Sequence, residues 1–219
     1  MQYYKKEFNI MNDIYIIGAG GFAKEVCFLI KSSTNFEVKG FIDKCSGEIE
    51  FNNYSIPIID EDYFLSNFKN VNVCIGIGNP MIISKLYNKY KDYKFPNIIH
   101  SSVIYDYDNI KIGSGNIITA GCKLTTFINI GSLNIFNLNT TVGHDVSIGN
   151  CNVFNPSVNI SGWCEIGDSN LLGVGSVILE KLKIGSNSIL GANSTLISNI
   201  ENDVVYVGTP AKYKKDNKN

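Results

Sequence analysis

The residues best suited to chemistry are His144 and its neighbour Asp145, in the segment VGHDVS. A neutral imidazole beside a carboxylate can act as a general base near pH 7, because the carboxylate orients the ring and stabilises the imidazolium that forms. Gly162 follows eighteen residues later and offers a backbone N–H that no side chain blocks, as an oxyanion donor requires. These residues indicate either a catalytic base with an oxyanion donor or an exposed histidine beside a solvated aspartate.

A glycine motif near the N-terminus is the second candidate site. The segment GAGGFA, which begins at Gly18, fits G-x-G-x-x-A between an expected strand and an expected helix. Backbone N–H groups at such a turn, with the helix N-terminus, can hold phosphate. Asp43 closes the next expected strand, where a ribose-binding acid belongs. Gly78 and Asn79 follow the third strand and would lie at the same carboxyl edge of the sheet, so we expect them to complete the site.

Strands and helices alternate over residues 13–96 and would position this edge. The segments DIYIIG, FEVKGFID and VNVCIGIG read as strands, and GFAKEVCFLIKSS, DEDYFLSNF and NPMIISKLYNKYKDY read as helices. The alternation predicts a small α/β domain, residues 1–97, with a parallel sheet covered on both faces. This half-Rossmann domain is too short for a dinucleotide fold, so it suits one nucleotide diphosphate, such as that of a nucleotide sugar.

From residue 98 the pattern changes to an apolar residue at every sixth position. A hexapeptide period specifies a parallel β-helix, here an all-β domain of residues 98–219. The series comprises Ile112, Ile118, Leu124, Ile130, Phe136, Val142, Ile148, Phe154, Ile160, Ile166, Leu172, Ile178, Ile184, Leu190 and Leu196.

An eighteen-residue period defines the coil of this β-helix. An Ile-Gly pair recurs at that spacing from Ile112 to Ile184, so three hexads form one coil of a triangular prism. The coil therefore places Gly162 one turn from His144. Asparagines at positions 116, 134, 152 and 170 are expected to stack as a ladder. Ile98, Ile104 and Ile110 are out of register and predict an irregular first coil. The C-terminal segment from residue 199 is expected to leave the repeat and to end in a basic, solvated tail.

The overall composition excludes several function classes. A formal net charge of −1 gives no basic field for nucleic acid or an anionic membrane. The segment MQYYKKEFNI has no signal-peptide pattern and reads as an extension before the first strand. No run of residues is apolar enough for a membrane span. We therefore expect a cytoplasmic protein. The 6 cysteines are scattered and are expected to be free thiols. The other of the 2 histidines, His100, is interpreted as structural, and we expect no metal site.

Taken in order, GAGGFAKEV, FID, IGIGN, the hexapeptide coils, the His-Asp corner and VGTPAK resemble one family. This family is the sialic-acid O-acetyltransferase-like sugar acyltransferases of the NeuD and PglD type. It includes the N-acetyltransferases of nucleotide-linked 4-amino sugars, and the similarity spans roughly residues 13–213. The resemblance implies a left-handed β-helix, acetyl-CoA as co-substrate and a homotrimer that binds CoA between neighbouring β-helices.

The resemblance also implies roles for individual residues. His144 would deprotonate the sugar amine as it attacks the thioester, with Asp145 raising its basicity and Gly162 facing the thioester carbonyl. Positions that match the family's CoA site are Val153, Gly162, Val174, Gly191 and Ala192. Positions that match its sugar-nucleotide site are Gly20, Gly21, Phe22, Asp43, Lys44 and Gly78. Many relatives carry histidine where this chain has Phe22 and Val153, so the contacts at these two positions differ from the family pattern.

The leading hypothesis is therefore an acetyl-CoA-dependent N-acetyltransferase acting on a nucleotide-linked 4-amino-4,6-dideoxy sugar in bacterial surface glycan biosynthesis. An O-acetyltransferase of sialic acid or another surface sugar shares the phosphate-binding motif and is the nearest alternative. A non-catalytic nucleotide-sugar binding protein is a third reading, against which the spacing of His144 and Gly162 argues. A β-helical carbonic anhydrase needs three histidines for zinc, and 2 are present.

Overall fold

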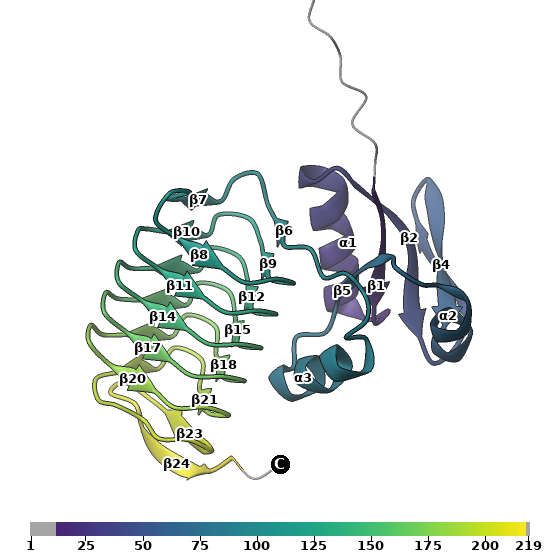
Figure 1. Ribbon diagram of the computed structural model, residues 1–219. Coiled ribbons are helices and arrows are strands. Elements are labelled where there is room, and N and C mark those ends of the chain that lie inside the picture. The colour runs from purple at the N-terminus through teal and green to yellow at the C-terminus, as the bar shows by residue number, and fades with distance from the viewer. Residues whose placement is uncertain (1–11, 218–219) are drawn as a thin grey trace, which may run out of the picture.

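The computed structural model describes residues 12–217, and the extension expected before the first strand lies outside them. Figure 1 shows an α/β part beside a β-helix whose coils stack along one axis. No helix among the described residues is long and apolar enough to cross a membrane. The two parts supply the two candidate sites.

The α/β part is a five-stranded sheet with strand order β3-β4-β2-β1-β5. Its strands are β1 (Asn12–Ile17), β2 (Phe36–Asp43), β3 (Gly47–Phe51), β4 (Tyr54–Asp60) and β5 (Asn72–Ile75). Its helices are α1 (Gly21–Ser33), α2 (Glu61–Asn67) and α3 (Pro80–Lys89). All strands are parallel except β3, which forms an antiparallel hairpin with β4.

The three strands and three helices expected from the sequence are confirmed, but the hairpin of β3 and β4 was missed. Phe51 pairs with Tyr54 across a two-residue turn, Asn52-Asn53, which is the short connection that favours a hairpin. The predicted purely parallel sheet is therefore wrong at one edge. Because β4 joins β2 in parallel, the hairpin adds the end of another strand, Asp60, to the carboxyl edge.

Side-chain caps define where two of these helices begin. The Asn79 carboxamide oxygen accepts from the backbone N–H groups of Met81 and Ile82, and Pro80 occupies the first turn of α3. The Asp60 carboxylate accepts from Tyr63 N at 2.9 Å at the start of α2. Such caps satisfy N–H groups that have no partner within the helix and contribute about 1 kcal/mol each.

Three sheets form the faces of the β-helix, and their strands pair in parallel except for β23 with β24. One contains β7 (Ile104–Tyr105), β10 (Lys123–Leu124), β13 (Thr141–Val142), β16 (Asn159–Ile160), β19 (Val177–Ile178) and β22 (Thr195–Leu196). A second contains β8 (Lys111–Ile112), β11 (Asn129–Ile130), β14 (Ser147–Ile148), β17 (Glu165–Ile166) and β20 (Lys183–Ile184). The third contains β6 (Ile98–Ile99), β9 (Ile117–Ile118), β12 (Ile135–Phe136), β15 (Val153–Phe154), β18 (Leu171–Leu172), β21 (Ile189–Leu190), β23 (Val204–Val207) and β24 (Lys212–Asp216).

The residues of the hexapeptide series form the interior of this left-handed β-helix, as predicted. Each is the second residue of its strand, and all except the half-buried Ile112 are at most 5% exposed. Phe136 and Phe154 stack with ring centroids 4.7 Å apart. Burial of an aliphatic side chain contributes about 1.5–3 kcal/mol to the free energy of folding. This series therefore forms a stable hydrophobic core that needs no bound ligand.

The asparagine ladder is also confirmed. The Asn116 carboxamide oxygen accepts from the backbone and side-chain nitrogens of Asn134, and the pattern repeats at Asn152. The ladder ends at Ser188, which lacks the amide, and the Nδ2 of Asn170 has no partner among the described residues. A fully buried amide without a partner is uncommon, and here it marks the point where the repeat changes.

Both ends of the β-helix depart from the eighteen-residue register. In the first coil Ile98 pairs with Ile117 and Ile104 with Lys123, one residue more than in later coils, as the shifted isoleucines predicted. At the other end the expected solvated tail is instead an antiparallel hairpin of β23 and β24 on the third sheet. The side chains of β24 are exposed, so the prediction that this segment is solvated is confirmed, whereas the prediction of a tail is wrong.

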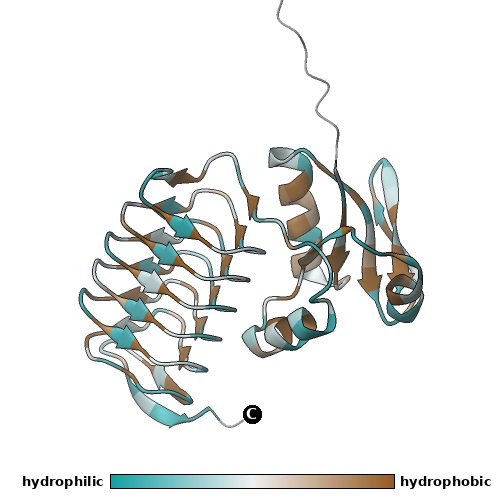
Figure 2. Cartoon of the chain, viewed as in Figure 1, coloured by the Kyte–Doolittle hydropathy of each residue, from teal (hydrophilic) through white to brown (hydrophobic). Residues whose placement is uncertain are grey.

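The third sheet carries the α/β part. Its strands β9, β12, β15, β18 and β21 are apolar at both residues, so they are hydrophobic throughout in Figure 2. The outward-facing Ile117, Ile135 and Val153 are at most 2% exposed and belong to the same hydrophobic cluster as the sheet and α1. Since α1 lies between the sheet and the β-helix, the glycine turn at its start is held on a continuous core (Figure 1).

The cysteines are free thiols, as expected, and all except Cys45 are buried. Burial raises the pKa of Cys122 and of Cys151 to about 11. A protonated, buried thiol is a poor nucleophile, so these cysteines are packing residues.

Candidate active site

His144 and Asp145 lie on the turn between β13 and β14, at one edge of the prism. The Nδ1 of His144 is 2.8 Å from the Asp145 carboxylate oxygen Oδ2, and both side chains are nearly half exposed. With the proton on Nδ1 donated to the carboxylate, the lone pair of Nε2 is the basic position of the ring. The pair therefore has the hydrogen bond that a histidine general base requires.

Gly162 lies one coil below His144, as the eighteen-residue period predicted. A Cβ atom at this position would lie 2.8 Å from Cε1 and 2.9 Å from Nε2 of His144, so the imidazole rests directly against the glycine. The Gly162 carbonyl accepts from Lys181 N, whereas its N–H has no acceptor within residues 12–217. The eighteen-residue period thus brought the His144 ring against a buried glycine whose N–H is unpaired within the described residues.

Sequence reasoning missed the aromatic neighbour of this pair. Trp163 forms an edge-to-face contact with His144, with ring centroids 4.4 Å apart and an interplanar angle of 89°. Lys181 places its Nζ atom 5.3 Å from the centroid of the indole. The available signal was the position of the chain's 1 tryptophan, directly after Gly162.

The glycine turn after β1 is open to solvent. Gly18 has a φ of +98°, a conformation that favours glycine, and a Cβ there would lie 2.8 Å from Ile77 Cγ1. Gly20 precedes α1 as its cap residue, and a Cβ on Gly20 or Gly21 would have no atom within 4 Å. Packing therefore explains Gly18 but not the other two, which leave backbone N–H groups of a helix N-terminus accessible to an anion.

Asp43 ties the end of β2 to this turn. Its carboxylate accepts from Ala19 N at 3.0 Å and from Lys44 N at 2.8 Å. The carboxylate is held in place but keeps lone pairs that could accept from hydroxyl groups. Phe22 is half-buried against the core of the α/β part, and the side chain of Lys44 is exposed beside Asp43.

The third segment of the edge combines an open glycine with a structural cap. A Cβ on Gly78 would have no atom within 4 Å, so backbone could approach a ligand closely there. The side chain of Asn79 is instead engaged as the cap of α3. The carboxyl ends of β1, β2 and β5 thus bring Gly20, Asp43 and Gly78 to one edge, as parallel strands require.

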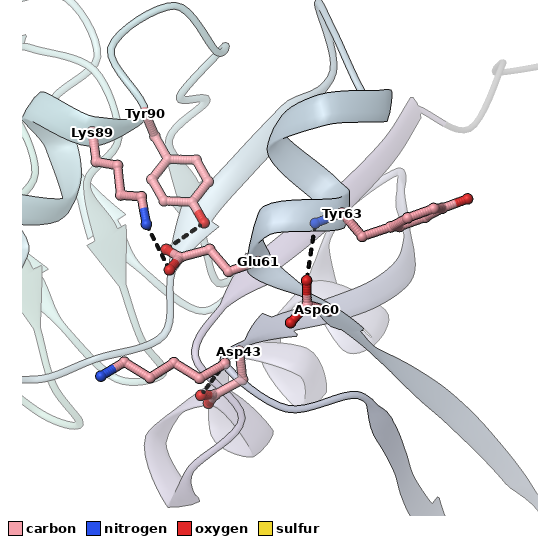
Figure 3. Close-up of polar contacts among 7 residues, drawn as sticks. Asp43, Asp60, Glu61, Tyr63, Lys89 and Tyr90 are labelled. Carbon is pink, nitrogen blue, oxygen red and sulfur yellow. Dashed lines mark hydrogen bonds and ion pairs between the residues drawn. The ribbon is translucent and has the colours of Figure 1, made fainter.

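A cluster of polar side chains joins α2 to α3 near Asp43. Glu61 accepts from the Tyr90 hydroxyl at 2.9 Å and pairs with Lys89 Nζ at 2.6 Å, which ties α2 to the end of α3 (Figure 3). Burial, the bond to Glu61 and, more weakly, the charge of Asp43 raise the pKa of Tyr90. Sequence reasoning did not single out these residues, because their partners are more than twenty positions away.

Apart from Gly162, which lies on the His144 edge, the residues matched to a CoA site fall into two groups. Val174 is 49% exposed on the turn between β18 and β19, and Gly191 and Ala192 lie one coil further along the same edge of the prism. This edge is not the one that carries His144, so a single chain does not bring the two together. Val153 is 1% exposed in the core beneath the α/β part, where its side chain is not accessible to a ligand.

His100 lies on the turn after β6, where its Nδ1 is 2.8 Å from the Ser102 hydroxyl and accepts from Ser102 N. These contacts fit the structural interpretation given to it. The described residues contain no group of three or more side chains that could hold a metal ion.

Together these features define a class: β-helical proteins with hexapeptide coils, a basic corner and an N-terminal α/β part with an open glycine edge. Residues 13–90 match the family described as the PglD N-terminal domain. The resemblance to PglD-type sugar acyltransferases is thereby confirmed for the α/β part. No curated protein sequence matches the chain.

Solved structures extend the similarity over nearly the whole chain. A variant of perosamine N-acetyltransferase from Caulobacter crescentus, in complex with CoA and GDP-perosamine, is 25% identical with a TM-score of 0.86, covering 94% of this chain and 99% of that chain. WeeI from Acinetobacter baumannii AYE is 28% identical with a TM-score of 0.80, covering 94% and 100%. The acetyltransferase domain of PglB from Neisseria gonorrhoeae FA1090, in complex with acetyl coenzyme A, shares the fold at 23% identity with a TM-score of 0.86, covering 93% and 100%.

Proposed function

We propose that this chain is an acetyl-CoA-dependent N-acetyltransferase acting on the amino group of a nucleotide-linked 4-amino-4,6-dideoxy sugar. The observation that carries the proposal is the His144 imidazole, hydrogen-bonded to Asp145 and resting on Gly162. The similar perosamine N-acetyltransferase was solved in complex with CoA and GDP-perosamine. CoA is the product that acetyl-CoA leaves, and GDP-perosamine is a nucleotide-linked amino sugar like the proposed acceptor. We place the reaction in the cytoplasm, in bacterial surface glycan biosynthesis.

The acceptor's diphosphate would bind at the glycine edge of the α/β part. The open backbone at Gly20, Gly21 and Gly78 supports this placement, because N–H groups at a helix N-terminus attract phosphate. Asp43 would accept from a ribose hydroxyl, and Phe22 and Lys44 would supply further contacts. We treat residues 1–97 as the acceptor-binding domain and residues 98–219 as the catalytic domain.

The proposed reaction uses one proton transfer in each direction. Nε2 of His144 takes a proton from the sugar amine while the amine nitrogen attacks the thioester carbonyl carbon of acetyl-CoA. The carbonyl electron pair moves to oxygen, and the Gly162 N–H stabilises the resulting oxyanion. When the tetrahedral intermediate collapses, the C–S bond breaks and the imidazolium returns its proton to the sulfur of CoA. The products are an acetamido sugar and CoA with a free thiol.

A trimer would complete this site. Val174, Gly191 and Ala192 lie on a different edge of the prism from His144, so we propose that the CoA-binding edge of one subunit faces the His144 edge of its neighbour. A prism with flat faces can associate about a threefold axis. In this arrangement the thioester reaches Gly162 across the subunit interface, and Val153 acts only as a core residue.

The test measures thiol release from acetyl-CoA with UDP-, dTDP- and GDP-linked 4-amino sugars and with sialic acids as acceptors. We expect thiol only with amino-sugar nucleotides and an N-acetylated product by mass spectrometry. Preference for sialic acid would instead make the chain an O-acetyltransferase, and no release with any acceptor would favour a binding protein. His144→Ala is expected to lower kcat at least ~100-fold, and near-normal turnover of that variant would contradict the mechanism.

A further inference from the structure

Trp163 occupies an unfavourable backbone position for its side chain. It has a φ of +56°, in the left-handed region that bulky residues rarely adopt, and its indole is 49% exposed. Other turns of the β-helix place asparagine in this conformation, as at Asn139, Asn187 and Asn193. Asparagine tolerates the left-handed region because its short polar side chain can bond locally. Neither backbone preference nor burial therefore explains a tryptophan at this turn.

The same edge of the prism offers a second aromatic residue for comparison. Phe127 has a φ of +53° and is 58% exposed, two coils before Trp163 and one before Asp145. No ring contact joins Phe127 to another aromatic side chain among the described residues, whereas Trp163 packs edge-to-face against His144. The two residues thus share backbone conformation and exposure but differ in their contact with the proposed base.

The imidazole of His144 has few other restraints. Its side chain is 46% exposed, Asp145 holds Nδ1, and Gly162 supports the ring from the next coil. A ring with one hydrogen bond and a glycine beneath it can still turn away from the corner about its Cα–Cβ bond. The indole blocks this movement on one side, and Lys181 lies over the indole from the following coil. An offset of about 1 Å in a reacting group can cost a hundredfold in rate, so such a restraint matters.

We infer that Trp163 is a positioning residue that holds the His144 imidazole in its reactive orientation. The inference rests on the proposed function, since it assigns Trp163 a part in the step that His144 performs. Trp163 acts through His144 and needs no contact with the acceptor. Its loss should therefore lower kcat and leave the acceptor KM nearly unchanged.

The decisive pair of variants is Trp163→Asn and Phe127→Asn. Both relieve the same backbone conformation, so both are expected to raise Tm by about 2–4 °C. Only Trp163→Asn should lower kcat, by about 10-fold with an acceptor KM within about twofold of wild type. Trp163→Phe keeps an aromatic ring at the turn and should recover most of the lost kcat. A kcat of Trp163→Asn equal to wild type, an equal loss in Phe127→Asn, or no recovery in Trp163→Phe would overturn the inference.

Proton NMR tests the contact independently of activity. The chain contains 2 histidines, so the ring signals of His144 can be assigned by their loss in His144→Ala. A ring at 4.4 Å should shift these signals, and the shift should disappear in Trp163→Asn but persist in Phe127→Asn. Unchanged signals in Trp163→Asn would overturn the inference. Wild-type acetyl transfer that is lost in His144→Ala but retained in Trp163→Asn would refute this inference while leaving the proposed function intact.

Discussion

The glycines of the two candidate sites differ in what surrounds them. In the β-helix, a Cβ on Gly162 would meet the imidazole of His144, and a Cβ on Gly143 would lie 2.8 Å from Gly162 N. At the edge of the α/β part, a Cβ on Gly20 or Gly78 would meet nothing within 4 Å. The first pair is fixed by close packing between coils, and the second is surrounded by open space.

This difference separates two tasks. Proton transfer and oxyanion stabilisation are sensitive to offsets of about 1 Å, which closely packed neighbouring coils can prevent. Recognition of a diphosphate needs exposed N–H groups and room for the ligand, which an open sheet edge provides. Substitutions should therefore affect kcat at the β-helix corner and KM at the glycine edge.

Gly162→Ala should produce the largest effect on catalysis among the glycine variants. The new methyl group would displace the His144 ring, which is nearly half exposed and can turn on the side that Trp163 does not cover, so the fold should persist with a Tm within a few degrees of wild type. We expect kcat to fall by about 100-fold, as for loss of one oxyanion donor or a misplaced base. Steady-state thiol release measures kcat, and a thermal melt measures Tm. A kcat near wild type would show that His144 and Gly162 do not carry the reaction.

Gly76→Ala, within the α/β part, should lower the stability of the fold, in contrast to Gly162→Ala, which should lower kcat. A Cβ there would lie 2.7 Å from both Ala23 Cβ and Ile16 Cγ2, in the fully packed space between α1 and β1. Overpacking of this kind destabilises a protein by about 1–3 kcal/mol. Urea unfolding should detect the change, and unchanged stability would mean that the contact of α1 with the sheet is looser than these distances indicate.

Gly20→Ala is the matched substitution at the open edge. Its methyl group enters free space, so urea unfolding should give a free energy within about 0.5 kcal/mol of wild type. If phosphate approaches this backbone, the acceptor KM should rise by about 3–10-fold while kcat and the KM for acetyl-CoA stay constant. An unchanged acceptor KM would place the diphosphate elsewhere.

The same contrast explains how much of the molecule the sequence could predict. In the β-helix each interior position repeats its neighbour's environment, so the period alone located the buried Ile148 and set Gly162 beneath His144. In the α/β part the hairpin of β3 and β4 was missed, because two short strands in one stretch carry little periodic signal. Trp163 was also missed, since its contact depends on how two side chains turn at one corner, and no repeat encodes that.

The smallest effect is expected at Asp106, in the irregular first coil. Its half-buried carboxylate accepts from the hydroxyl of Thr126, one coil before His144 on the same edge, and from Asn109 Nδ2. These hydrogen bonds, with Thr126 first, lower the pKa of Asp106. A carboxyl group with a lowered folded-state pKa stabilises the fold above its unfolded value near 3.9, and this contribution is lost as the pH falls through the folded value.

Asp106→Asn should therefore lower Tm by only about 1–2 °C at pH 7, and the deficit should shrink as the pH falls below about 4. Melts of the variant and wild type across pH 3–7 measure the difference, and kcat should change by less than about twofold because the His144 contacts are retained. A Tm deficit that does not vary with pH would trace the effect to the lost geometry of the first coil rather than to the charge. A large loss of kcat would instead show that catalysis also depends on the packing around Thr126, one coil before the proposed base.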